Sequence, residues 1–161
     1  MPYDKHLNDK IRTGRHCVFS MHVHLVFVTK YRKKVFENRH TTRLNDIFSD
    51  ICMKFEATLL ECNGEEDHVH LLIEYPPKVT VSKLVNNLKT ISSRMLRREY
   101  PEIQSRYFKN ALWTPSYFAG SCGGAPLEII KQYVQSQRTI NKREDGLISP
   151  PFRTRFYGED G

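Results

Sequence analysis

Two histidines and a tyrosine–glutamine pair are the residues of this chain whose types and spacing best suit chemistry. His68 and His70 alternate with Val69 ahead of an apolar run, a pattern typical of a strand that directs both imidazoles to one face. Tyr133 and Gln137 are separated by one helical turn and would share a helix face. Two imidazoles and an amide oxygen can hold a divalent metal ion, and a phenol can attack a phosphodiester that the ion polarises.

The His-x-His pattern alone does not identify the site, because His22 and His24 repeat it earlier in the chain. Acidic residues that favour a nearby cation precede only the later copy, at positions 65–67. We therefore predict that His68 and His70 bind Mg²⁺ or Mn²⁺ together with Gln137, although imidazoles also accept Zn²⁺. In isolation such a pair can equally be two half-exposed surface histidines.

Tyr133 also has an ordinary interpretation, as a half-buried helix residue whose hydroxyl lies in water. The chemical interpretation makes it a nucleophile toward DNA. A phosphotyrosine ester conserves the energy of the broken phosphodiester bond, and a free 3′-hydroxyl can reverse the reaction. The residues themselves leave both interpretations open.

The elements that must position these residues follow the order βαββαβα. Hydrophobic periodicity predicts strands over 17–29, 57–62, 67–75 and 112–121, with a turn at Asn63-Gly64. Helices are expected from Thr41 or Thr42 to about residue 55, over 81–99, and from Pro126 to 139. This order predicts an α+β, ferredoxin-like (RRM-like) βαββαβ antiparallel sheet with an additional C-terminal helix that carries the tyrosine. Its first and third strands are neighbours, so His22 or His24 could support the metal ligands.

Length and charge describe a single basic domain. The chain has 161 residues, a net charge of +7 and a pI near 9.3, which favour a polyanionic partner. We expect a polar arm over 1–15, the main domain over 16–140 and a mobile tail over 141–161. The four cysteines form no CxxC pair, and no apolar run reaches the roughly 18 residues of a membrane span. A cytoplasmic protein with reduced thiols is therefore expected.

One loop combines positive charge with an aromatic ring, as a binding site for single-stranded nucleic acid requires. It consists of Lys30, Tyr31, Arg32, Lys33 and Lys34. Arg94, Arg97 and Arg98 on the following long helix are further DNA-binding candidates, although a charged helix face is often only solvated.

Four blocks of the chain resemble the small single-tyrosine HUH transposases of the TnpA type, in the order and spacing of that family. The blocks are 24–34 (HLVFVTKYRKK), 67–72 (DHVHLL), 112–118 (LWTPSYF) and 130–137 (IKQYVQSQ). The resemblance implies a homodimeric transposase that recognises hairpins in single-stranded DNA, with active sites shared between subunits. It implies a 5′-phosphotyrosine link at Tyr133, and His68, His70 and Gln137 as metal ligands.

Three other functions compete with this one. The chain could be a hairpin or single-strand binder without activity, a metal hydrolase in which Tyr133 is structural, or a domesticated relative that processes chromosomal palindromes. The presence of all four site residues favours the active transposase over the binder.

Overall fold

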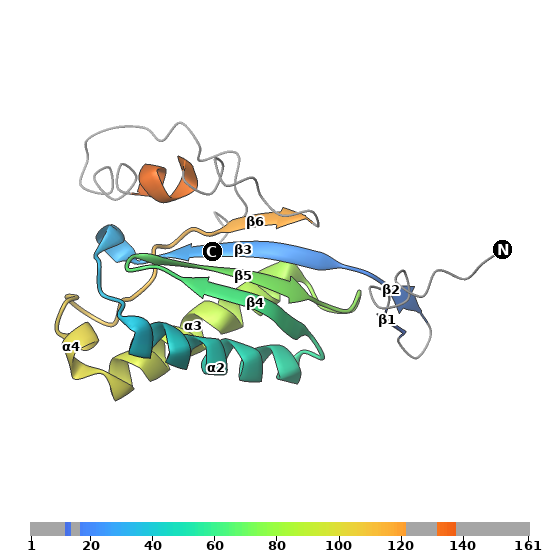
Figure 1. The fold of residues 1–161 in the computed structure, drawn as a ribbon, viewed down its shortest axis with the longest axis horizontal. Helices are drawn as coiled ribbons and strands as arrows, with labels where there is room; N and C mark the ends of the chain where they lie inside the picture. The colour runs from blue at the N-terminus through green and yellow to red at the C-terminus, as the bar shows by residue number, and fades with distance from the viewer. Residues whose placement is uncertain (1–11, 14–16, 122–131, 138–161) are drawn as a thin grey trace.

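The computed structural model describes residues 12–13, 17–121 and 132–137, whose arrangement Figure 1 shows. Its main element is an antiparallel four-stranded sheet in the order β4-β5-β3-β6. The strands are β3 (His22–Val28), β4 (Thr58–Gly64), β5 (His68–Glu74) and β6 (Phe118–Ser121). The predicted α+β fold is confirmed, and the strands that carry the two His-x-His patterns are the central pair.

The two faces of the sheet carry different residues because side chains alternate along each strand. Helices α2 (Asn38–Lys54) and α3 (Val81–Glu99) cover one face (Figure 1). The main core lies between the helices and this face, and it includes Leu25, Phe27, Leu71, Ile73, Leu44, Phe48, Leu84 and Leu88, all fully buried. The opposite face carries the histidines, and the helical residues 132–137 pack there in a second apolar cluster.

Several smaller elements divide the predicted strands. β1 (Arg12–Thr13) pairs with β2 (Val18–Phe19), so the predicted strand 17–29 becomes β2 and β3. In the predicted strand 112–121 only β6 joins the sheet ladder, and Trp113 adds one isolated bridge to Thr29. The segment 114–117 between them is a loop. A one-turn helix, α4 (Pro101–Gln104), follows α3 directly.

Two predicted boundaries were wrong for local reasons. Helix α2 begins at Asn38 rather than near Thr41, because the His40 ring accepts a hydrogen bond from the Glu37 N–H at 2.9 Å and so caps the first turn. The predicted turn residues Asn63 and Gly64 belong to β4, and the chain reverses at 65–67.

The ends of the chain lie largely outside the described residues. The rest of the predicted helix 126–139, the tail 141–161 and most of the arm 1–15 fall there. Among the described residues, no helix is long and apolar enough to cross a membrane.

Candidate active site

His68 and His70 lie on the same face of central strand β5. Their rings are 6.2 Å apart between centroids and nearly parallel, at 21°. Both side chains are partly exposed. Burial lowers the pKa of His70, and the neighbouring His68 and His24 lower it further, which favours the neutral imidazole that a metal ion requires.

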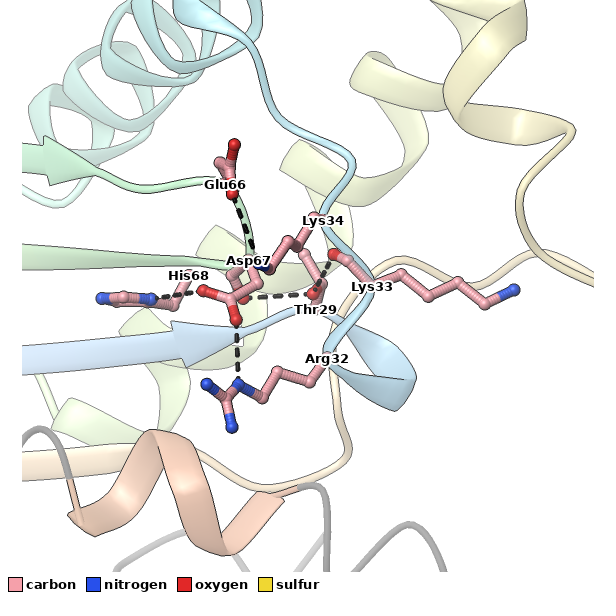
Figure 2. A network of polar contacts seen from close by, with 7 residues as sticks. All are labelled: Thr29, Arg32, Lys33, Lys34, Glu66, Asp67 and His68. Atoms are coloured by element: carbon pink, nitrogen blue, oxygen red, sulfur yellow. Dashed lines mark hydrogen bonds and ion pairs between the residues drawn. The ribbon is translucent and has the colours of Figure 1, made fainter.

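Asp67 orients His68 through its carboxylate. The His68 Nδ1–H lies 2.8 Å from Asp67 Oδ1, and Arg32 Nε donates to Oδ2 at 2.9 Å (Figure 2). Burial would raise the pKa of Asp67, but the hydrogen bonds from His68 and Arg32 outweigh it and hold that pKa below its usual value. Because Nδ1 carries the hydrogen that Asp67 accepts, the lone pair of Nε2 is available to bind a metal ion. This arrangement is common to metal-binding histidines.

The backbone at Asp67 is held by the strand end of β3. Thr29 donates to the Asp67 carbonyl oxygen from both its backbone N–H, at 2.9 Å, and its hydroxyl, at 3.1 Å. The same hydroxyl also lies 2.7 Å from the Lys33 carbonyl oxygen (Figure 2). The buried Thr29 therefore joins the basic loop to the backbone next to His68.

The earlier histidine pair shares this face but is offset along the sheet. In the β3–β5 register, Val28 lies opposite His68 and Val26 opposite His70, whereas His24 and His22 face Leu72 and Glu74. The His24 ring meets that of His70 edge-on, at 6.3 Å between centroids. His22 Nε2 instead lies 3.3 Å from the Glu74 carboxylate. His24 is thus a neighbour of the predicted ligands, and His22 is engaged elsewhere.

Tyr133 is completely buried on the histidine-bearing face of the sheet. It packs with Val26, Val28, Phe118 and Val134, so it covers the strand positions directly opposite His70 and His68. The alternative interpretation of Tyr133 as a half-buried ring with its hydroxyl in water was therefore wrong about its exposure. Burial raises the pKa of Tyr133, and hydrogen bonds with Ser116 and Thr114 only partly offset this.

Ser116 links Tyr133 to Gln137. Its Oγ lies 3.0 Å from the tyrosine hydroxyl and donates to Gln137 Oε1 at 3.0 Å. Ser116 was not predicted as a site residue, because no local pattern marks a serine in a loop that meets a helix later in the chain.

Lys89 of α3 holds the loop that carries Ser116. Its ammonium donates to the carbonyl oxygens of Thr114 at 2.7 Å, Pro115 at 3.2 Å and Ser116 at 3.2 Å. Burial lowers the pKa of Lys89 to about 8, so it remains charged at neutral pH. Lys89 therefore serves the loop rather than an open basic surface.

The predicted DNA-binding loop forms the short helix η1 (Lys30–Arg32) and the residues after it. Tyr31 is 47% exposed. Three of the cations already have protein partners: Arg32 with Asp67, Lys33 with the Arg106 carbonyl oxygen, and the exposed Lys34 with Glu66 at 3.8 Å. Arg32 thus belongs to the histidine site as well as to the loop.

The three arginines of α3 also differ from one another. Arg94 and Arg98 are exposed. Arg97 is partly buried, which lowers its pKa, and it donates to Ser93 Oγ and to Gln104 Oε1.

Among the described residues, no third acidic, cysteine or histidine side chain joins His68 and His70 in a metal-binding arrangement. In the part of the chain that the structure describes, no group of three or more His, Cys, Asp or Glu side chains is arranged to hold a metal ion. A metal bound by the two histidines would therefore need another donor, and an amide oxygen such as that of Gln137 is chemically suitable.

The family model described as "Transposase IS200 like" matches residues 17–137. A transposase for insertion sequence element IS200 from Salmonella typhimurium strain LT2 is 28% identical over 143 residues, 89% of this chain and 93% of the relative. The ISDra2 transposase TnpA of Deinococcus radiodurans is 29% identical over 128 residues, 80% and 91% of the two chains. A crystal structure of a Deinococcus radiodurans R1 protein assigned as a transposase is 29% identical and superposes with a TM-score of 0.72, covering 78% of this chain and 97% of that one.

Proposed function

Because this chain belongs to the family of IS200-like transposases, we propose that it cleaves and rejoins single-stranded DNA at hairpin-bearing ends through a covalent bond to Tyr133. The observation that carries this proposal is the position of Tyr133 over Val26 and Val28, the strand partners of His70 and His68. A tyrosine and two imidazoles on one sheet face are components that such a reaction needs.

In the proposed reaction the Tyr133 oxygen attacks the scissile phosphorus, and the bond from phosphorus to the 3′ oxygen breaks. The DNA 5′ end then remains esterified to the tyrosine, and the other strand leaves as a 3′-hydroxyl. The proton that the phenol loses balances the proton that the 3′ oxygen gains. The reverse attack by a 3′-hydroxyl rejoins the strands and restores Tyr133.

The site residues suit a divalent cation. Mg²⁺ or Mn²⁺ bound by His68, His70 and Gln137 would supply Lewis-acid polarisation of the scissile phosphate. The Asp67 contact fixes the His68 ring with Nε2 available, and Gln137 Oε1 retains a second lone pair beside its bond from Ser116.

Tyr133 must leave its buried position before a phosphate can reach it, because its side chain has no solvent exposure. The hydrogen bond to Ser116 breaks in that movement. We therefore interpret the described arrangement as the resting state of the nucleophile. As in the resemblance described above, we expect a homodimer with shared active sites.

DNA contacts are proposed for the loop 30–34 and for Arg94 and Arg98, which are exposed. Arg97 and Lys33 would contribute less, because both donate to protein acceptors. Phosphate contacts of this kind give binding that weakens with added salt.

Incubation with labelled hairpin-bearing single-stranded DNA and Mg²⁺ or Mn²⁺ tests the reaction. A protein–DNA adduct that survives denaturation is expected from the native protein and from the control variant Tyr75→Phe, but not from Tyr133→Phe. An adduct that persists in Tyr133→Phe would disprove the nucleophile, and cleavage without any adduct would favour a hydrolase.

The histidine assignment has its own matched pair of variants. His68→Ala should abolish cleavage and leave hairpin binding largely intact, whereas His22→Ala should retain cleavage because His22 pairs with Glu74. The opposite result would mean that the other histidine pair holds the ion.

A further inference from the structure

Phe108 is the most exposed large apolar side chain among the described residues, at 90%. It lies in the loop between α4 and Leu112, beside Lys109, whose ammonium is 5.9 Å from the centre of the Phe108 ring. Lys109 has a φ of 66°, in the left-handed region that side chains rarely adopt. The loop therefore presents a phenylalanine to solvent in a backbone conformation that carries some strain.

The residues next to Phe108 anchor this loop firmly. Tyr107 is buried, and the Lys33 ammonium lies over its ring at 5.0 Å. Lys33 also donates to the Arg106 carbonyl oxygen at 2.5 Å, and the Lys30 N–H donates to that of Leu112 at 2.7 Å. The exposure of Phe108 thus occurs on an anchored loop.

The anchor joins Phe108 to the second exposed aromatic residue of this surface. Tyr31 also has a left-handed φ, of 59°, and the ammonium groups of Lys30 and Lys33 lie 5.5 and 5.9 Å from its ring centre. Segments 29–34 and 105–111 together contain no Asp or Glu, and each contains two or more basic residues. We name these two segments the aromatic loop surface.

A polar groove continues from the aromatic loop surface. It has a volume of about 430 Å³ and is lined from both loops by Lys30 and Asn110, and from α3 by Asn86, Lys89 and Arg97, with no carboxylate in its lining. Exposed aromatic rings beside cations, next to a groove that has no carboxylate in its lining, fit an extended polyanion that carries flat apolar groups. Single-stranded DNA has this chemistry. An acidic protein partner fits the surface less well, because a protein supplies no repeated flat faces on which the aromatic rings could stack.

We propose that Phe108, together with Tyr31, stacks against unpaired bases of the DNA substrate while Lys30 and Lys109, which lie beside these rings, contact its phosphates. This inference rests on the proposed function for its substrate class and adds to it a base-binding element outside the histidine–tyrosine site. Each stacked base contributes sequence-tolerant affinity, because every base has an aromatic face.

The test compares equilibrium binding of a hairpin with single-stranded flanks to that of a blunt duplex, by fluorescence anisotropy without added divalent metal. Phe108→Ala should weaken binding of the flanked hairpin about 5- to 150-fold, the range for losing one stacked base, and leave the duplex unchanged. Phe108→Trp should bind like the native protein. Met53→Ala, a matched control at another exposed apolar residue, should have no effect.

Abasic sites placed one at a time in the unpaired flank locate the partner base. At one position the abasic substrate should bind the native protein as weakly as Phe108→Ala binds intact DNA, and combining the two changes should add nothing further. Equal binding of the flanked hairpin by Phe108→Ala and native protein would overturn the inference. So would a Phe108→Ala variant that changes from dimer to monomer, since the ring would then pack against a second copy.

The adduct assay on the same samples separates the two proposals. A native protein that forms the Tyr133 adduct, with Phe108→Ala binding normally, refutes only the stacking inference. A native protein that forms no adduct but shows the base-dependent loss in Phe108→Ala refutes only the strand-transfer reaction.

Discussion

Replacement of Asp67 by Asn tests whether this carboxylate positions His68 for metal binding. Asp67 accepts from His68 at 2.8 Å and from Arg32 at 2.9 Å, and its side chain is only 10% exposed. Asn has one acceptor oxygen where Asp has two, so in Asp67→Asn one of the two donors would face an N–H group. The shape of the side chain is kept, and only this hydrogen-bonding match is lost.

The expected magnitudes follow from that mismatch. Loss of a carboxylate that orients a metal-binding histidine weakens metal affinity about 10- to 100-fold. A lost hydrogen bond to a charged group lowers the free energy of unfolding by about 1.5–3 kcal/mol. The Arg32 side chain is 30% exposed, so solvent screening places the expected loss toward the lower end of that range.

Titration calorimetry with Mn²⁺ measures the affinity, and urea unfolding of the metal-free protein measures the stability. Glu66→Gln is the matched control, because it removes the same charge one position earlier in the chain. The Glu66 side chain is 68% exposed, and its ion pair with Lys34 is long, at 3.8 Å (Figure 2). It should leave both quantities nearly unchanged. Equal loss of Mn²⁺ affinity in the two variants would show that net charge, and not the orientation of His68, accounts for the effect.

Three further predictions concern contacts that hold the site in place. Ser116→Ala and Tyr133→Phe should each lower the free energy of unfolding by about 1–3 kcal/mol. The double variant should lose less than the sum, because both changes remove the same partly buried hydrogen bond; chemical unfolding of all three variants measures this coupling. Lys89→Met should speed amide exchange in the loop 114–117 by leaving three carbonyl oxygens without their donor, whereas Lys83→Met, at an exposed position of the same helix, should not. Gly64→Ala should lower stability by about 1–3 kcal/mol, because a Cβ there would overlap Thr41 Cγ2 and lie 2.8 Å from Thr41 Cβ; Thr41→Ser should recover only part of the loss in a thermal-unfolding comparison, because it removes Cγ2 and keeps Cβ.

The parts of the fold that follow local periodicity could be predicted from the sequence. Alternation along β5 places His68 and His70 on one face, and the βαββαβ order makes β3 its neighbour. The predicted helix 81–99 matches the observed ends of α3, Val81 and Glu99; in the structure Thr80 caps its first turn and Pro101 follows its last. The alternation along β5 and the bounds of α3 depend on residues close together in the sequence, whereas the neighbour of β5 follows from the order of the elements.

The parts that depend on distant contacts could not be predicted. The burial of Tyr133 depends on Ser116, Phe118 and two valines of β3, which no window around residue 133 contains. The start of α2 was misplaced because His40, inside the helix, performs the capping that the threonines were expected to perform.

Arg32 shows why charge alone was an incomplete guide to the proposed DNA-binding surface. Within one basic loop, Tyr31 is exposed, Arg32 binds Asp67 and Lys33 anchors the loop of Phe108. The cation count of the loop therefore overstates the number of phosphates it can neutralise. The same contacts join the loop to the site, because Arg32 and His68 share one carboxylate. A displacement of Arg32 by a DNA phosphate would change the hydrogen bonding of Asp67, and through it the hold on the His68 ring.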